Sequence, residues 1–319
     1  MNNDLHLTSQ RPAIPPMLAI LIAIIAVSTS SIFIRFAQEK APSLVIAAYR
    51  LSLATLVLTP YTLARHRPEI KAALSQKKLA GLAILSGVLL AFHFATWITS
   101  LQFTSVASSV VLVTTSPLWV ALFSPLFLKE PLPWYVWIGL VITLIGGMVV
   151  GASDSCQWSA NGISCPTLST FLQGKAFTGD ILAVLGALFA SGYILIGRRL
   201  RPTMALPAYT FLVYGVAALV LLAIVALSGE SLVGYPWLTY LFFLALALIP
   251  QLVGHSTFNW ALRYLSAAYV SIALLGEPLG STILAYFVLS EIPSPFKLGG
   301  LALILSGIMV ASIPVNKRK

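Results

Sequence analysis

The sequence predicts an all-α membrane protein with ten transmembrane helices, arranged as two inverted repeats of five helices each. Three observations support this prediction. Hydrophobic residues make up 58% of the chain, charged residues only 9%, and the mean hydropathy is +0.93. Because soluble domains contain roughly 25% charged residues, this composition excludes a soluble globular fold. Apolar runs long enough to cross a bilayer recur along the chain, and its two halves share residues at a constant separation.

The apolar runs define the ten candidate spans, taking about 20 residues as the length that crosses a bilayer. We place them at residues 15–36, 42–63, 79–101, 104–127, 133–152, 179–197, 207–227, 237–262, 265–289 and 296–314. The first run follows a polar N-terminal segment and lacks a small-residue cleavage site at its end. We therefore expect it to be a membrane span of the mature protein and not a signal peptide.

The sequence repeats itself at a separation of 161 residues, which relates Pro117 to Pro278 and Glu130 to Glu291. Glycines in the fifth span of each half keep the same separation. Apolar helices share leucines by composition alone, but composition does not place Pro, Glu and Gly at one offset. We therefore predict two homologous halves, residues 15–152 and 179–314, joined by a loop at 153–178.

The positions of the basic residues predict the orientation in the membrane. With a cytoplasmic N-terminus, the segments on the inner side hold 14 Lys and Arg residues and those on the outer side hold 4. The positive-inside rule then predicts cytoplasmic tails at 1–14 and 315–319 and an extracytoplasmic loop at 153–178. Since each half has an odd number of spans, the second half enters the membrane inverted. Inverted repeats are typical of alternating-access transporters.

The net charge of +10 does not indicate a nucleic-acid partner. The basic residues lie in short segments between apolar runs, and they form no basic face with interleaved aromatic residues. The loop 153–178 contains both cysteines of the chain, Cys156 and Cys165. Two thiols on the extracytoplasmic side either close a disulfide or remain free, and in both cases we expect a role in loop stability and not in chemistry.

An ionisable residue in the middle of the ninth span marks the first candidate site. Glu277 lies about 12 residues into the span, on the order of 18 Å from the inner face. It is followed by Pro278, so we expect the helix to break here, as at Pro117 in the first half. Two interpretations remain open: Glu277 binds a substrate amine or a proton, or it forms an ion pair with Arg50, at similar depth in the second span.

Aromatic and amphiprotic side chains form a second candidate group. His93 and Trp97 lie one turn apart in the third span, and His255 and Asn259 lie one turn apart in the eighth. Such stripes suit a cavity for an amphiphilic solute, with Tyr193 as a further aromatic wall. Alternatively, each His is bonded to a neighbouring helix. By depth, we expect His93 in the outer half of the bilayer and His255 in the inner half.

Hydroxylated residues near the proline of the fourth span are a third group, with Thr115 and Ser116 as the candidates for lining a polar cavity. Packing between helices is the alternative role for such residues. Ser116 stands where the second half has Glu277, so a carboxylate role is asymmetric between the halves. The spacing of His, Cys, Asp and Glu residues gives no ligand set for a metal, and we expect no metal and no cofactor.

In three features the chain is similar to the drug/metabolite transporter superfamily. It has ten spans in two halves, Arg50 lies on the second span, and the stretches at Pro117 and Pro278 are each followed thirteen residues later by a glutamate. Within it, the chain resembles the EamA family over about residues 15–314. The resemblance implies a bundle of ten helices around a central cavity, and export without ATP across a cytoplasmic (inner) membrane. It also implies loop closure or gating at Glu130 and Glu291.

The function expected from these features is secondary transport, in the export direction, of a small organic metabolite such as an amino acid or an aromatic compound. The expected partners are this solute and the lipid bilayer, with the chain acting as a monomer or homodimer and not as an enzyme. The alternative is a polytopic membrane enzyme that acts on a lipid or isoprenoid substrate. Such an enzyme would need His93, His255 and Glu277 close to one reacting centre.

Overall fold

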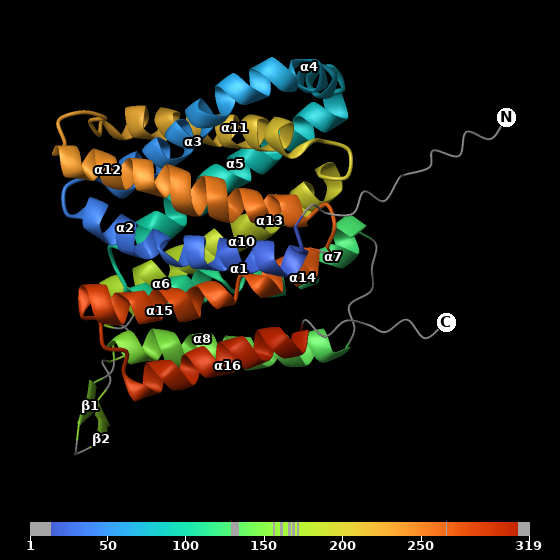
Figure 1. The fold of residues 1–319 in the computed structure, drawn as a ribbon. Helices are drawn as coiled ribbons and strands as arrows, with labels where there is room; N and C mark the ends of the chain where they lie inside the picture. Colours follow the sequence, from blue (N-terminus) through green and yellow to red (C-terminus); the bar gives the residue numbers. More distant parts are fainter. Residues whose placement is uncertain are drawn as a thin grey trace.

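The computed structural model describes residues 14–128, 134–155, 157–159, 162–164, 167, 170, 172–265 and 267–311. Its helices run side by side in one bundle, with a small two-stranded antiparallel hairpin beside one end (Figure 1). Helices dominate because a chain this apolar must satisfy its backbone hydrogen bonds within each segment when it lies in lipid.

In the first half, the elements follow the predicted spans. They are α1 (Pro16–Ser28), α2 (Ser30–Gln38), α3 (Ser43–Arg65), α4 (Arg67–Ser75), α5 (Lys77–Ser100), α6 (Val106–Val113), α7 (Ser116–Leu128) and α8 (Trp134–Ser155). The hairpin strands β1 (Gln157–Ser159) and β2 (Gly162–Ser164) come next. Because α1 and α2 are separated by Thr29 alone, they form one apolar rod over Pro16–Gln38.

The second half is also helical, and it contains one unusual segment. It comprises α10 (Lys175–Leu200), α11 (Leu206–Ser228), α12 (Trp237–Leu246), the π-helix η1 (Ala247–His255), α13 (Ser256–Ala261), α14 (Ala267–Ala273), α15 (Gly276–Leu289) and α16 (Pro295–Ala311). The π-helix contains Pro250, and it continues α12 directly into α13. Segments of π-helix are rare in proteins, and many of those that occur lie at functional sites.

Seven helices of the described chain are long and apolar enough to cross a membrane. They are Pro16–Gln38, Ser43–Arg65, Lys77–Ser100, Val106–Phe127, Lys175–Leu200, Leu206–Ser228 and Trp237–Ala261. Two of the other predicted spans correspond to shorter apolar helices, Trp137–Val150 and Pro295–Val310. The remaining predicted span, 265–289, is divided into α14 and α15. The chain is therefore a multi-pass membrane protein.

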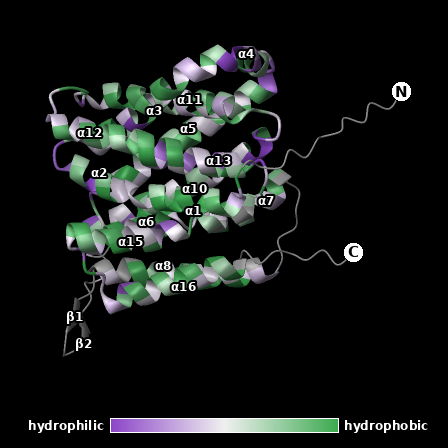
Figure 2. Ribbon diagram, in the orientation of Figure 1, coloured by the Kyte–Doolittle hydropathy of each residue, from purple (hydrophilic) through white to green (hydrophobic). Residues whose placement is uncertain are grey.

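Hydrophilic residues gather toward both ends of the bundle, and helix α4 is among the most hydrophilic segments (Figure 2). Helix α1 begins and α16 ends at the end of the bundle where α4 lies (Figure 1). At this end the carboxylate of Glu69 accepts the N–H of Ala205 at 2.6 Å. Arg201 donates to the carbonyls of Asn259, at 3.0 Å, and Met204. Burial lowers the pKa of Arg201 to about 10, so this side chain stays protonated at neutral pH.

A glutamate ties the halves together at the opposite end. The carboxylate of Glu291 accepts from Arg35 Nη2 at 3.2 Å and from the N–H of Val106 at 2.9 Å. Arg35 also donates to the carbonyl of Thr104 at 3.0 Å. One carboxylate thus holds the end of α2, the start of α6 and the connection between α15 and α16.

The last helices of the two halves, α8 and α16, pack along each other through glycines. A Cβ on Gly146 would lie 2.8 Å from the backbone N of Ile304 and 2.9 Å from the carbonyl oxygen of Gly300. A Cβ on Gly300 would lie 3.0 Å from the backbone N of Val150. These backbone atoms cannot move aside as a flexible side chain would, so the two helices approach this closely only because both residues are glycine.

Replacement of Gly300 by Ala is expected to destabilise the protein by about 1–3 kcal/mol, since the added methyl group forces α8 and α16 apart. Gly299 is the matched control on the same helix, because a Cβ there meets nothing within 4 Å. For Gly299→Ala we expect no loss of stability. The higher helix propensity of Ala would raise the free energy of unfolding by up to about 0.5–1 kcal/mol. Melting of both variants in detergent tests this contact, and equal melting temperatures would contradict it.

Candidate functional site

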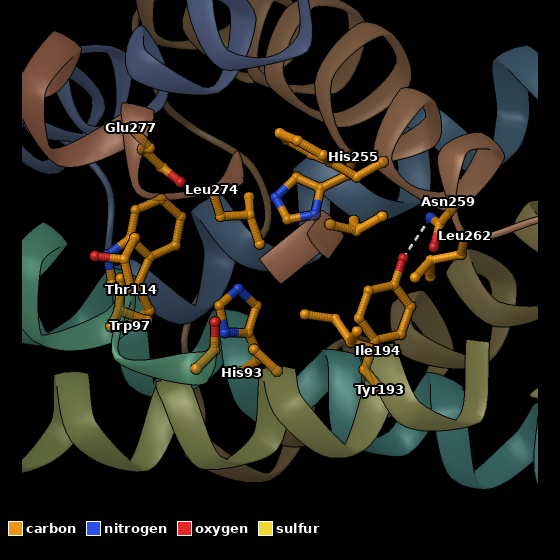
Figure 3. A pocket seen from close by; sticks show the side chains of 15 residues that line it. His93, Trp97, Thr114, Tyr193, Ile194, His255, Asn259, Leu262, Leu274 and Glu277 are labelled. Carbon is orange, nitrogen blue, oxygen red and sulfur yellow. Dashed lines mark hydrogen bonds between the residues drawn. The ribbon is translucent and has the colours of Figure 1, made fainter. Parts of the chain in front are cut away.

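A cavity lies between helices of the two halves. Its walls come from α5, α6 and α7 of the first half and from α10, η1, α13, α14 and α15 of the second (Figure 3). The residues predicted from the sequence that line it are His93, Trp97, Ser116, Tyr193, His255, Asn259 and Glu277. The space open to the centre of a water-sized sphere is about 40 Å³. This is room for roughly three waters at about 10–15 Å³ each.

Both interrupted helices break at this cavity. Thr114 and Thr115 separate α6 from α7, and Leu274 and Leu275 separate α14 from α15. Proline removes an N–H and clashes with the carbonyl four residues earlier, so each break precedes its proline and does not coincide with it. As a result, Pro117 and Pro278 lie within the first turns of α7 and α15 and do not line the cavity.

Glu277 lies in the first turn of α15 and faces the cavity, with 6% of its surface exposed. Among the residues that the structure describes, none makes a side-chain hydrogen bond or salt bridge with it. A carboxylate is favoured at a helix N-terminus because the dipole there is positive. Its lone pairs nevertheless need donors, so Glu277 is an acceptor that is available to a ligand or to water.

The two histidines meet in the cavity. Their ring centroids lie 6.3 Å apart, and His93 also stacks on Trp97 at 5.8 Å and 14°. The expectation that His93 lies in the outer half of the bilayer and His255 in the inner half stays a prediction, and the contact shows that both side chains reach the same cavity. His255 ends the π-helix η1. Nδ1 of His93 bonds the carbonyl of Gly186 at 2.9 Å, which leaves Nε2 as an acceptor when Nδ1 carries the proton.

Arg50 lies beside the cavity without lining it. Its guanidinium is fully buried, donates to Gln251 Oε1 at 2.8 Å and Ser30 Oγ at 2.7 Å, and covers the Phe94 ring at 4.2 Å. In this structure no carboxylate from the described ranges approaches within 4 Å of it, so the ion pair with Glu277 expected from the sequence is not formed. The two side chains come from helices at similar depth, but Arg50 is instead held by neutral acceptors.

A buried hydrogen-bond chain fixes the polar wall of the cavity. Asn259 Nδ2 donates to the hydroxyl of Tyr193 and, at 3.3 Å, to that of Tyr214. The hydroxyl of Tyr214 lies 3.2 Å from Ser256 Oγ, which bonds the carbonyl of Gln251. Because the side chain of Gln251 accepts a hydrogen bond from Arg50, this series of hydrogen bonds links the cavity wall to the buried guanidinium.

Several residues predicted from the sequence lie elsewhere. Thr115 does not line the cavity: its hydroxyl donates to the carbonyl of Leu112 at 2.7 Å, and the neighbouring Thr114 lines the wall instead. Glu130, Cys156 and Cys165 lie outside the described residues.

Other lining residues were not among the predictions made from the sequence. They are Val113, Thr114, Ala190, Ile194, Phe258, Leu262, Val270 and Leu274. Most are apolar, and an apolar residue in a membrane helix carries no signal that separates a cavity wall from a packed or lipid-facing position. Leu274 is the exception, since its place four residues before Pro278 marks the helix break.

The chain is similar to known proteins over most of its length. The model of a family described as EamA-like transporter family matches residues 14–152 and 177–313. The uncharacterized transporter YdfC of Bacillus subtilis is 26% identical over 209 residues, which cover 65% of this chain and 62% of YdfC. The pseudopaline exporter CntI of Pseudomonas aeruginosa is 23% identical over 303 residues, which cover 94% of this chain and 96% of CntI.

A solved crystal structure of another protein shares the fold. The two chains superpose with a TM-score of 0.64 at 21% sequence identity, over 93% of this chain and 96% of the other.

Proposed function

Because the chain belongs to the EamA-like transporter family, we propose that it is a secondary transporter that exports a small organic metabolite by alternating access. The substrate class is an amino acid or an aromatic compound. Family membership and the long apolar helices make the protein a multi-pass membrane transporter. The substrate class, direction and mechanism are the parts that we propose.

The cavity between the broken helices is the observation that carries the proposal. In secondary transporters, substrate sites lie near the bilayer midplane where discontinuous helices of two repeats meet. Here α7 and α15 both begin at one cavity, and the breaks before them lie at corresponding places in the repeat. This supports two inverted halves, 15–152 and 179–314, with five spans each.

The lining chemistry supports a solute with an amine and an apolar or aromatic body. Glu277 supplies a carboxylate without a protein partner among the described residues, and His93 Nε2 is a further acceptor facing the same space. Trp97, Tyr193 and Phe258 supply aromatic surface. A protonated amine is a donor that attracts both a carboxylate and aromatic faces.

The orientation that we propose places both termini in the cytoplasm and the loop 153–178 outside, in a cytoplasmic (inner) membrane. The common end of α1, α4 and α16 supports this, since the basic residues around α4 mark the cytoplasmic side. One relative is named an exporter, which favours the outward direction. The cavity has room for only a few waters, so helices must separate before a solute can bind in it.

Reconstitution into liposomes tests this function. Purified protein is expected to move at least one member of a panel of radiolabelled amino acids and aromatic amines down its gradient, at rates well above those of protein-free liposomes. Absence of transport for every member, in both directions, would overturn the proposal. Parallel mass analysis of the liposome lipids covers the alternative of a membrane enzyme, whose activity would appear as a chemically altered lipid.

A further inference from the structure

The two half-helices that begin at the cavity differ in charge. Helix α15 carries Glu277 in its first turn, whereas the equivalent position of α7, 161 residues earlier, is Ser116. A helix N-terminus has a partial positive charge and N–H groups without partners inside the helix. At α15 the protein's own carboxylate occupies this environment. At the N-terminus of α7, a helix of 13 residues, the chain provides no carboxylate.

An indole donor faces the space before α7. Trp97 is 2% exposed and lines the same cavity as Thr114 (Figure 3). Its Nε1–H has no hydrogen-bond partner in the part of the chain that the structure describes. Ser116, also 2% exposed, lines the same wall, and no described residue bonds its hydroxyl. A buried donor without a partner is costly, so a ligand acceptor that reaches it gains a hydrogen bond which the protein itself does not supply.

The fixed charges around the cavity also constrain the ligand. Arg50 contributes a buried guanidinium beside the cavity, and Glu277 is not joined to it in a salt bridge. The guanidinium carbon of Arg50 lies 5.9 Å from the ring of Trp97, so its field is positive on the side of the cavity where the indole lies. A ligand that carries both a carboxylate and an ammonium group adds no net charge to this buried interior.

We propose that the N-terminal end of α7 and the indole N–H of Trp97 form a carboxylate-binding subsite, opposite an ammonium-binding subsite at Glu277. The substrate is then a zwitterion with both groups. The inference rests on the proposed transport function and deepens it, because it assigns the two ends of the solute to the two half-helices.

Matched ligands test this subsite on the full-length protein in detergent. The phenylalanine series consists of L-phenylalanine, L-phenylalaninamide and 3-phenylpropionate, and the leucine series of L-leucine, L-leucinamide and 4-methylpentanoate. Affinities follow from ligand-induced shifts of the melting temperature. In at least one series we expect the zwitterion to bind more tightly than the amide and the acid, each of which lacks one of its two charged groups.

Trp97→Phe keeps an aromatic ring and removes the N–H. We expect it to weaken binding of the zwitterion and of the acid about 10-fold or more, while binding of the amide changes less than about twofold, because a hydrogen bond to a carboxylate is stronger than one between neutral groups. The matched control is Trp119→Phe. The indole N–H of Trp119 is also without a partner among the described residues, but Trp119 does not line the cavity, so no ligand should respond.

A second variant keeps the test valid if Trp97→Phe loses stability. Ser116→Glu gives α7 the carboxylate that α15 has, and it should exclude zwitterions and acids while admitting the amides. Equal binding of zwitterion and amide by the unaltered protein, an equal loss of both in Trp97→Phe, or binding of no member of either series would overturn the subsite. If the amides are still transported in liposomes, only the subsite fails; if nothing is transported, the proposed function fails as well.

Discussion

Replacement of Glu277 by Gln is expected to lower the transport of amine-bearing substrates about 100-fold, since a hydrogen bond between charged groups is worth on the order of 3 kcal/mol. The same variant should melt at an unchanged or higher temperature. Glu277 is 6% exposed and makes no side-chain hydrogen bond or salt bridge with the described residues, so its replacement by the neutral Gln breaks no such contact. Transport in liposomes and melting in detergent measure the two effects.

Glu291 is the matched control, because it is the carboxylate with protein partners. Glu291→Gln weakens the contact with Arg35 and should lower stability by up to about 1 kcal/mol, the value typical of a half-exposed pair. A lower melting temperature of Glu277→Gln with a proportionate loss of transport would mean that Glu277 is structural. Full transport activity in Glu277→Gln would remove it from the site altogether.

Replacement of Arg50 by Leu is expected to cost about 3 kcal/mol or more of folding free energy. The change leaves Gln251 Oε1 and Ser30 Oγ buried without their donor, and it removes the cation above the Phe94 ring. The melting temperature in detergent is the measurement. Because Gln251 belongs to η1 and Ser30 to α2, the loss should loosen the contact between the halves, and transport should fall together with stability.

Arg50→Lys separates charge from geometry. Lysine keeps the positive charge but lacks the planar guanidinium whose separate N–H groups bond Gln251 and Ser30. We therefore expect Arg50→Lys to recover only a small part of the stability that Arg50→Leu loses. If Arg50→Lys melts as the unaltered protein does, the charge alone matters and the hydrogen bonds of the guanidinium do not. If Arg50→Leu is as stable as the unaltered protein, the buried network contributes nothing.

The sequence predicted the helices better than the contacts between them. Seven of the predicted spans are long apolar helices in the structure, because hydropathy and length alone decide which segments can cross lipid. The helix breaks were expected at Pro117 and Pro278, and they lie in the turn before each proline. The difference follows from the steric clash of proline with the preceding turn.

The partners of the polar residues could not be predicted in the same way. Arg50 was paired with Glu277 because both are charged and lie at similar depth, but Gln251, 201 residues away, takes the guanidinium. Depth along a helix does not reveal which way a side chain points around the helix axis. His93 and His255 show the same limit, since counting residues along each helix did not reveal that their rings meet in one cavity.

The π-helix also makes the two halves unequal. Segment Ala247–His255 is π-helical, whereas α5, the helix of the first half that carries His93, is a regular α-helix from Lys77 to Ser100. Under the alternating-access mechanism that we propose, interchangeable halves would give inward-open and outward-open forms of equal free energy. Among the described residues η1 lies in one half only, and Glu277 corresponds to Ser116 in the other, so we expect the two forms to differ in free energy and the empty protein to favour one side of the membrane.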